Sequence, residues 1–217
     1  MHVSSIPYAL CDEEMVHIPD VRKGDRRLFS CPECGEGLFF KAGEIRIPHF
    51  SHYPESMCSM SLESALHYYA KHYIASAIKK RDENVQFKFQ VDTLPDLFRR
   101  SLLLFDTNRS EYAVSIMDLV RYFEVYNVNV EKMFDIYKPD VLCNDYDLNR
   151  FLAFEVAVTH YSTEEKIAFY LENDIAYIEF VPVVHEDGKT LSFTVEAHNL
   201  DEFLKTRFDI LIKSFVH

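Results

Sequence analysis

Side chains that can bind a zinc ion are concentrated near the N-terminus. Cys31 and Cys34 form a CxxC pair that is followed by a glycine. After a spacer of fourteen residues the chain supplies His49, His52 and Cys58. Tetrahedral zinc takes four nitrogen or sulfur ligands, and two short groups of ligands joined by a loop supply them with little strain. A closed site with four protein ligands is structural, so the spacing predicts one structural Zn²⁺.

Five candidates compete for the four places in this site. The prediction places both paired cysteines, His52 and Cys58 around the ion, with His49 as the substitute. The alternative is a set of buried thiols and unrelated histidines that bind no metal. A redox-active CxxC pair is disfavoured, because nothing nearby resembles the βαβ unit of a thioredoxin.

Two carboxylates in strand-like surroundings suggest a second cation site. Asp140 follows a proline at the start of a short apolar segment, and Glu155 lies in the middle of an apolar run over residues 151–158. A buried glutamate is costly unless it is paired or bound to a metal. Two carboxylates on neighbouring strands can converge on Mg²⁺ or Mn²⁺, since oxygen ligands suit such ions. The bound ion would lower the pKa of a water and stabilise the charge on a phosphodiester.

A third group of polar residues follows helical spacing. Glu63, His67 and Lys71 are each four residues apart, within a segment whose apolar residues recur with helical periodicity over residues 62–80. The three side chains would therefore occupy one stripe of a helix. A solvated helix face with ordinary contacts between residues i and i+4 has the same pattern, so the spacing alone leaves both interpretations open.

The elements that must position these residues alternate between strands and helices. A strand near residues 15–19 is followed by a hairpin at 37–41 and 44–48. After the helix at 62–80, the apolar patterns predict strands at 85–91, 128–136, 139–143, 151–158 and 175–183, and helices at 113–123, 163–172 and from Asn199 onward. This order is typical of an α/β domain with a mixed sheet.

Composition narrows the class of protein. The chain has 217 residues and a formal net charge of −12, with 48% hydrophobic and 27% charged residues. No apolar run approaches the ~20 residues of a membrane-spanning helix, and the start does not resemble a secretory signal, so we expect a cytoplasmic protein with no membrane partner. The acidic charge is unusual for a nucleic-acid binder. It is explained by carboxylates gathered at a cation site or by an acidic face that docks a basic partner.

Four motifs in this chain resemble the competence protein CoiA-like family. They are CPECGEGLFFKAGEIRIPHFSH followed by a cysteine, ESALHYYAK, KPDVL and FLAFEVAVTHYSTEEK. Proteins of this family join an N-terminal zinc module to a nuclease domain of the PD-(D/E)xK type. The resemblance, which extends from about Tyr8 to Val183, implies a small zinc-binding β-hairpin module over residues 1–60. It also implies a restriction-endonuclease-like, mixed-sheet α/β domain with a C-terminal helix over residues 61–217.

The resemblance also implies roles for individual residues. The family's helix motif of Glu, His and Lys falls on Glu63, His67 and Lys71. Its metal-binding aspartate falls on Asp140, and its second carboxylate falls on Glu155. These five residues are the predicted catalytic set, with the last two as ligands of a catalytic Mg²⁺ or Mn²⁺.

One position departs from the family pattern. The second motif of the nuclease superfamily ends in Lys, and CoiA-like proteins commonly have Gln there, but this chain has Ala157. Alanine cannot orient or polarise an attacking water. Lys71 is the first candidate to replace the missing group, and Lys166 on the following helix is the second.

These features predict a metal-dependent nuclease that hydrolyses DNA, in bacterial DNA uptake and recombination or in phage defence. The alternative is a catalytically inactive module of the same fold that binds nucleic acid or a recombination or defence protein, which would be consistent with Ala157 and the acidic charge. RNA is a further possible substrate. The site itself indicates only phosphodiester chemistry, and the pathway is implied by kinship.

Overall fold

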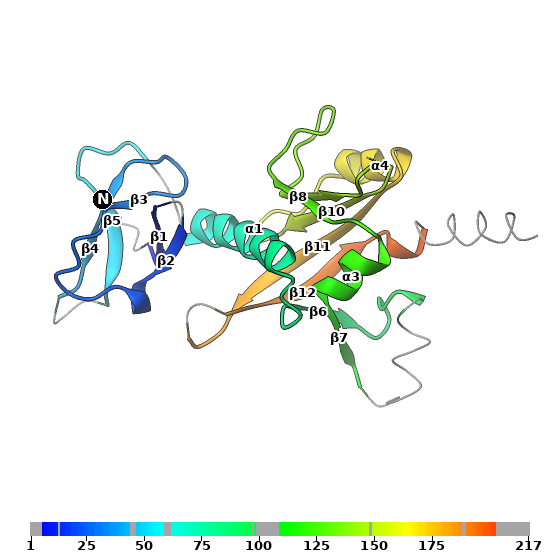
Figure 1. Cartoon of the computed structure of the whole chain (residues 1–217), viewed down its shortest axis with the longest axis horizontal. Helices are drawn as coiled ribbons and strands as arrows, with labels where there is room; N and C mark the ends of the chain where they lie inside the picture. The colour runs from blue at the N-terminus through cyan, green and yellow to red at the C-terminus, as the bar shows by residue number, and fades with distance from the viewer. Residues whose placement is uncertain are drawn as a thin grey trace, which may run out of the picture. The chain divides into compact units, whose positions relative to one another are not determined.

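The computed structural model describes residues 6–12, 14–43, 47–58, 62–96, 98, 109–147, 149–187 and 190–202. At residues 62–64 it describes the backbone alone. The chain divides into two compact units (Figure 1). The first comprises Met1–Ala70 and Val184–Thr190, and the second comprises Lys71–Val183 and Leu191–His217. The predicted boundary after residue 60 stays a prediction.

The first unit contains a five-stranded sheet in the order β2-β1-β3-β4-β5, with antiparallel pairing between neighbours. Its strands are β1 (Tyr8–Cys11), β2 (Glu14–His17), β3 (Phe29–Ser30), β4 (Gly37–Lys41) and β5 (His49–His52), and a short 3-10 helix η1 (Ile18–Asp20) follows β2. Ile6 and Phe50 form a bridge that brings the chain before β1 to β5. Both side chains are fully buried, and Phe50 packs against the Phe29 ring with centroids 5.0 Å apart.

Helix α1 (Leu62–Lys80) has the length that the apolar periodicity predicts. In the first unit, the buried Tyr69 of this helix stacks on Tyr8 with ring centroids 4.7 Å apart. His17 packs edge-on against Tyr69 at 4.5 Å. The helix ends with Lys79 and Lys80, whose charges favour the negative end of the helix dipole.

The second unit is built on a seven-stranded mixed sheet in the order β7-β6-β12-β11-β10-β9-β8. Strands β10 and β11 pair in parallel, as do β12 and β6, whereas the β6–β7, β9–β10 and β8–β9 pairs are antiparallel. The strands are β6 (Gln86–Gln90), β7 (Glu111–Ser115), β8 (Asn127–Val130), β9 (Val141–Asn144), β10 (Phe151–Val156), β11 (Ile175–Val184) and β12 (Leu191–His198), and the helices are α3 (Ile116–Tyr122) and α4 (Glu164–Glu172).

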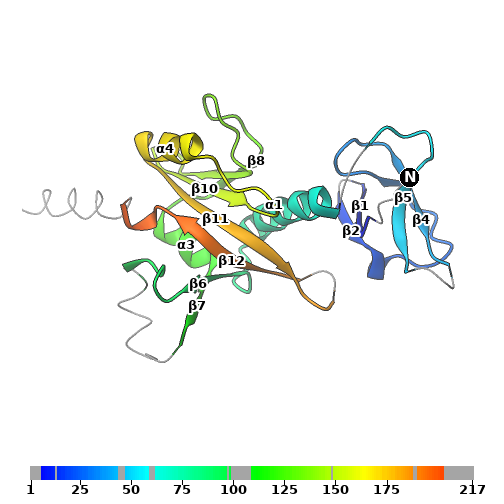
Figure 2. The same cartoon turned by 180° about the vertical axis from the view of Figure 1, so that it is seen from behind.

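Helices cover both faces of this sheet (Figures 1 and 2). On one face α4 places Phe169 and Tyr170 against a cluster that includes Ala153 of β10. The next residue, Phe154, points to the opposite face because side chains alternate along a strand. There its ring stacks on the Phe87 ring, which in turn stacks on Phe193. Tyr73 of α1 packs against Phe193 on the same face. The second unit therefore has helix, sheet and helix layers.

The mixed α/β class with two sheets is confirmed, but several element boundaries were predicted wrongly. Residues 47 and 48 of the predicted second hairpin strand precede β5, which begins at His49, and residues 44–46 lie outside the described residues. The strand expected over 128–136 ends at Val130, and Glu131 has a left-handed backbone with φ of 50°. Strands β1, β3, β7 and β12 were not predicted, and residues 113–115 of the expected helix at 113–123 belong to β7. The part of the expected final helix beyond residue 202 lies outside the described residues.

Asn199, where the final helix was expected to begin, directly precedes the helical residues 200–202, and its side chain also binds β11. Its side-chain oxygen accepts a hydrogen bond from the backbone N–H of Tyr177 at 2.7 Å, and its side-chain amide donates to the carbonyl of Ile175 at 2.8 Å. The buried amide thus holds the start of β11. No helix among the described residues is long and apolar enough to cross a lipid bilayer.

Candidate functional site

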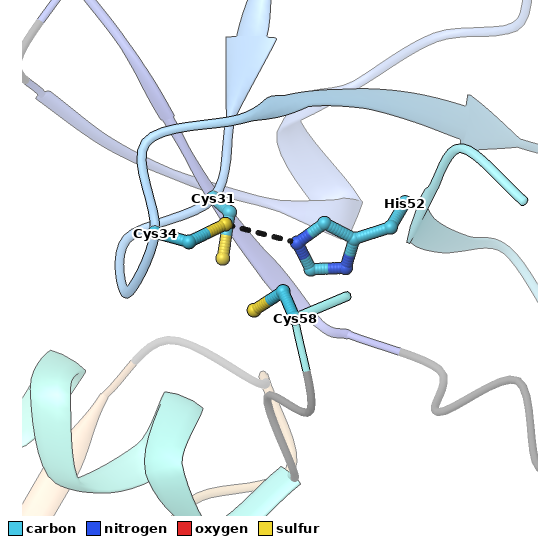
Figure 3. Close-up of side chains that lie close together, drawn as sticks. All are labelled: Cys31, Cys34, His52 and Cys58. Atoms are coloured by element: carbon cyan, nitrogen blue, oxygen red, sulfur yellow. Dashed lines mark hydrogen bonds between the residues drawn. The ribbon is translucent and has the colours of Figure 1, made fainter. Parts of the chain in front are cut away.

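Cys31, Cys34, His52 and Cys58 converge in the first unit (Figure 3). Their ligand atoms all lie within 4.8 Å of one another, and Cys34 Sγ is 3.4 Å from His52 Nε2. The first cysteine directly follows β3, the histidine ends β5, and the last cysteine lies on the segment beyond that strand. Ligands that are separated in the sequence are therefore brought together by the β3–β4–β5 pairing.

A tight turn shapes the CxxC segment. The N–H of Cys31 donates to the carbonyl of Glu36 at 2.7 Å, and the N–H of Gly35 donates back to the carbonyl of Cys31 at 2.9 Å. Gly35 has φ of 75°, a conformation that residues with a Cβ adopt only with strain. The glycine after the second cysteine is therefore required by the turn that presents both thiols to one point.

The structure does not bring His49 into the cluster. His49 and His52 are three positions apart on β5, and residues at odd separations on a strand point to opposite faces. His49 is buried, and its Nδ1 is 2.9 Å from the carbonyl oxygen of Ile47. Of the two histidines that the spacing left open, the strand thus selects His52.

The donor set fits zinc. Three sulfur atoms and one imidazole nitrogen form one of the common tetrahedral ligand sets for structural zinc, with Zn–S bonds of about 2.3 Å. The separations within the cluster need only a small contraction to reach that geometry. Burial raises the pKa of the Cys31 thiol to about 12, so a cation must supply the energy that ionises it. These four residues could bind one Zn²⁺.

The second unit places the two predicted carboxylates on adjacent strands. Phe154 of β10 pairs with Val141 of β9, so Glu155 and Asp140 face each other one step further along the same antiparallel register. Asp140 Oδ2 accepts a hydrogen bond from the backbone N–H of Val156 at 2.9 Å. The aspartate is therefore tied to the strand that carries the glutamate.

Glu155 is buried and held by two side chains from α4. The Tyr170 hydroxyl donates a hydrogen bond to Oε1, and Lys166 Nζ lies 2.8 Å from Oε2. Burial raises the pKa of Glu155 to about 7, the Lys166 charge opposes this rise, and the Asp140 charge adds to it. A carboxyl that titrates near neutral pH in such a charged cluster is a common feature of functional sites.

Glu179 is a further buried carboxylate that the sequence analysis missed. It pairs with Glu155 across the parallel β10–β11 register, and its Oε1 accepts a hydrogen bond from the Ser162 N–H at 2.6 Å. Burial raises the pKa of Tyr170 most strongly, and the charges of Glu155, Asp140 and Glu179 raise it further, so the hydroxyl stays protonated. The signal was available, because Glu179 interrupts an apolar run just as Glu155 does.

The three residues of the predicted helix motif have different surroundings. Lys71 is only 5% exposed, which does not fit a solvated helix face, and its Nζ lies 2.6 Å from Glu131 Oε1. The Glu131 N–H in turn donates to the carbonyl of Asp140 at 3.0 Å. Glu63 and His67 belong to the first unit, and the Glu63 side chain lies outside the described residues. Catalytic roles for these two residues stay predictions.

The two clusters differ as metal sites. Among the described residues, the thiol cluster alone brings three or more metal-ligand atoms close together. The carboxylates of the second unit do not form a second cluster of this kind. An ion held by Asp140 and Glu155 would thus take most of its ligands from elsewhere. This agrees with the usual coordination of Mg²⁺, which binds through one or two carboxylates and keeps several waters.

The fold and the thiol cluster define an α/β protein with a candidate N-terminal zinc module. Residues 13–61, which include the whole thiol cluster, match the family model described as the N-terminal domain of competence protein CoiA. This match supports the resemblance of the N-terminal part of the chain to the CoiA-like family. Searches of the curated proteins and of the solved structures found no match.

Proposed function

We propose that the chain is a metal-dependent nuclease that hydrolyses DNA phosphodiester bonds, with a PD-(D/E)xK-type second unit. The environment of Glu155 is the main support for the proposal. Its carboxyl is buried beside Asp140, and burial raises its pKa to about 7. It also accepts hydrogen bonds from Lys166 and Tyr170. Burying a carboxylate among such groups costs stability, and catalysis is a common reason to retain it.

Asp140 and Glu155 are the residues that would hold Mg²⁺ or Mn²⁺. A bound ion of this kind supplies a water of lowered pKa and stabilises the charge that develops on the phosphate. The chain's own part is to fix the two carboxylates, through the Val156 N–H on one side and Lys166 and Tyr170 on the other. The proposed biological setting is DNA uptake and recombination, in keeping with the competence family, or phage defence.

A second candidate function is a module of the same fold that binds nucleic acid or a recombination or defence protein without cleaving. Ala157 favours it, because its buried methyl group occupies the place where related nucleases carry a polar water-orienting group. The net charge of −12 favours a basic protein as the partner of such a module.

Cleavage of labelled single-stranded DNA, double-stranded DNA and RNA tests the proposal. Metal should be omitted and then added as Mg²⁺ or Mn²⁺, because a chelator would also remove zinc. The wild type is expected to cleave only with added metal, and Asp140→Ala and Glu155→Gln are expected to lose activity while keeping their fold. Glu111→Gln is the matched control, since it removes a strand carboxylate that is half-exposed and paired with Lys88. A wild type that binds DNA but cleaves nothing would support the second candidate.

A further inference from the structure

The residue two positions after Glu155 provides no charge. Ala157 is 2% exposed, and its N–H donates to the carbonyl of Phe180 at 2.8 Å. Alternation along the strand places its methyl group on the same face as the Glu155 carboxylate. That face therefore lacks a cation from β10 itself.

Helix α4 brings a cation to this face from another direction. Thr163 caps the helix by accepting a hydrogen bond from the Lys166 N–H at 3.3 Å, which fixes where the first turn begins. Lys166 and Tyr170 are one helical turn apart, so both project from the same side of α4. Each contacts a different oxygen of Glu155, and the lysine Nζ lies 5.9 Å from the centre of the tyrosine ring.

Lys166 is more exposed to solvent than the Glu155 carboxylate that it contacts. The Lys166 side chain keeps 18% of its surface exposed, against 5% for Glu155. The lysine thus approaches the carboxylate from the side that solvent reaches. An ammonium has three N–H donors, and the contact with Oε2 uses one of them, so donors are available for a water or a phosphate oxygen.

Lys71, the other candidate cation, forms its ion pair with a different carboxylate. Its ammonium is directed to Glu131 Oε1 at 2.6 Å, where Lys138 also approaches at 3.6 Å. The contact with Glu155 therefore favours Lys166, the second candidate from the sequence, as the replacement for the missing group.

We propose that Lys166 is the catalytic cation of this site, supplied from α4 in place of the absent lysine on β10. The inference rests on the proposed nuclease function. In hydrolysis, the oxygen of a water bonds to phosphorus and the bond from phosphorus to the leaving oxygen breaks. The attacking water loses its proton to solvent, and the leaving oxygen takes a proton from solvent. Lys166 donates hydrogen bonds that orient the water and stabilise the negative charge on the phosphate as the new bond forms.

Moving the lysine back to β10 tests this assignment. The test compares kcat and KM of the wild type, Lys166→Met and the double variant Lys166→Met/Ala157→Lys. Lys166→Met is expected to lower kcat by about 100-fold or more with little change in KM, because the lysine acts as the bond forms. The double variant is expected to recover at least about tenfold, since its new lysine emerges beside Glu155. Lys88→Met, which removes a half-exposed lysine that is ion-paired with Glu111, is the matched control and should retain activity.

The outcomes separate this inference from the proposed function. A wild type that cleaves no substrate overturns both. An active wild type combined with an active Lys166→Met overturns the inference alone. If kcat falls in Lys166→Met and the double variant does not recover it, Lys166 has a structural role in the site. This result also overturns the inference. If Lys166→Met does not fold, the double variant decides, because it restores a cation beside Glu155; a folded but inactive double variant contradicts the proposal.

Discussion

Replacing Glu155 with glutamine should change how the stability of the protein depends on pH. Burial raises the pKa of this carboxyl from 4.5 to about 7. Between these two values the folded chain holds a proton that the unfolded chain has released. The contribution of Glu155 to stability is therefore fully present below about pH 4.5 and is lost as the pH rises through about 7.

The size of this loss follows from the two pKa values. They differ by about 2.5, and each pKa unit corresponds to ~1.4 kcal/mol, so the loss amounts to ~3 kcal/mol. Glutamine keeps the shape of the side chain but does not titrate. Its oxygen can accept a hydrogen bond from Lys166, and its NH2 group can donate one to the Tyr170 hydroxyl. The wild type should therefore lose ~3 kcal/mol more than Glu155→Gln between pH 4.5 and 8.

Urea unfolding followed by circular dichroism at a series of pH values measures the difference. Both proteins should be studied without added Mg²⁺ or Mn²⁺, since such ions favour the ionised carboxylate. Other titrating groups affect both proteins alike and cancel in the comparison. Parallel stability curves for the two proteins would refute the reasoning, because they would mean that Glu155 has the same pKa in the folded and unfolded chains.

Three further predictions concern the candidate zinc site and α4. His52→Ala should abolish binding of one zinc ion per chain whereas His49→Ala should keep it, as measured by metal content after gel filtration; the reverse result would mean that the ligands are assigned wrongly. Gly35→Ala should lower the free energy of unfolding by ~1 kcal/mol because alanine is strained at φ of 75°, and an unchanged melting temperature would contradict this. Thr163→Ala should cost ~1 kcal/mol through loss of the helix cap, whereas Thr163→Ser should cost less, as urea unfolding would report.

The helices were the most predictable part of the fold. Helix α1 follows from apolar periodicity alone, and α4 begins where it was predicted, with the Thr163 hydroxyl as its cap. The strand β12 was missed although the buried Leu191, Phe193 and Val195 alternate with less buried residues, which is the pattern of a half-covered strand. Here the signal was present and was not used.

Other differences had no clear signal in the sequence. The chain turns at Glu131 with a left-handed backbone, although glutamate is not a residue that favours this conformation, so the predicted strand was too long. The choice between His49 and His52 depends on where β5 starts, because the parity of positions decides which face a side chain occupies. The predicted strand ended before both histidines, so the preference for His52 did not come from the strand, although the cluster contains His52 as predicted.

The candidate acidic site was predicted only in part. Asp140 and Glu155 were identified, and the adjoining strands place them opposite each other as expected. The pairing of Lys166 with Glu155 depends on how α4 packs back across the sheet, which is a tertiary contact that spacing along the chain does not specify. The same packing decides that Lys71 is directed to Glu131 instead.

The β10–α4–β11 connection has a consequence for how the protein folds. Glu155, Lys166, Tyr170 and Glu179 all belong to one continuous segment, because only residues 157–174 separate the two parallel strands. Strands β6 and β12, by contrast, pair across an interval of about a hundred residues. Closing a short loop costs less chain entropy than closing a long one. We therefore expect β10, α4 and β11 to assemble early in folding, before β6 and β7 join the sheet. Amide exchange during refolding should show that β10 and β11 are protected first.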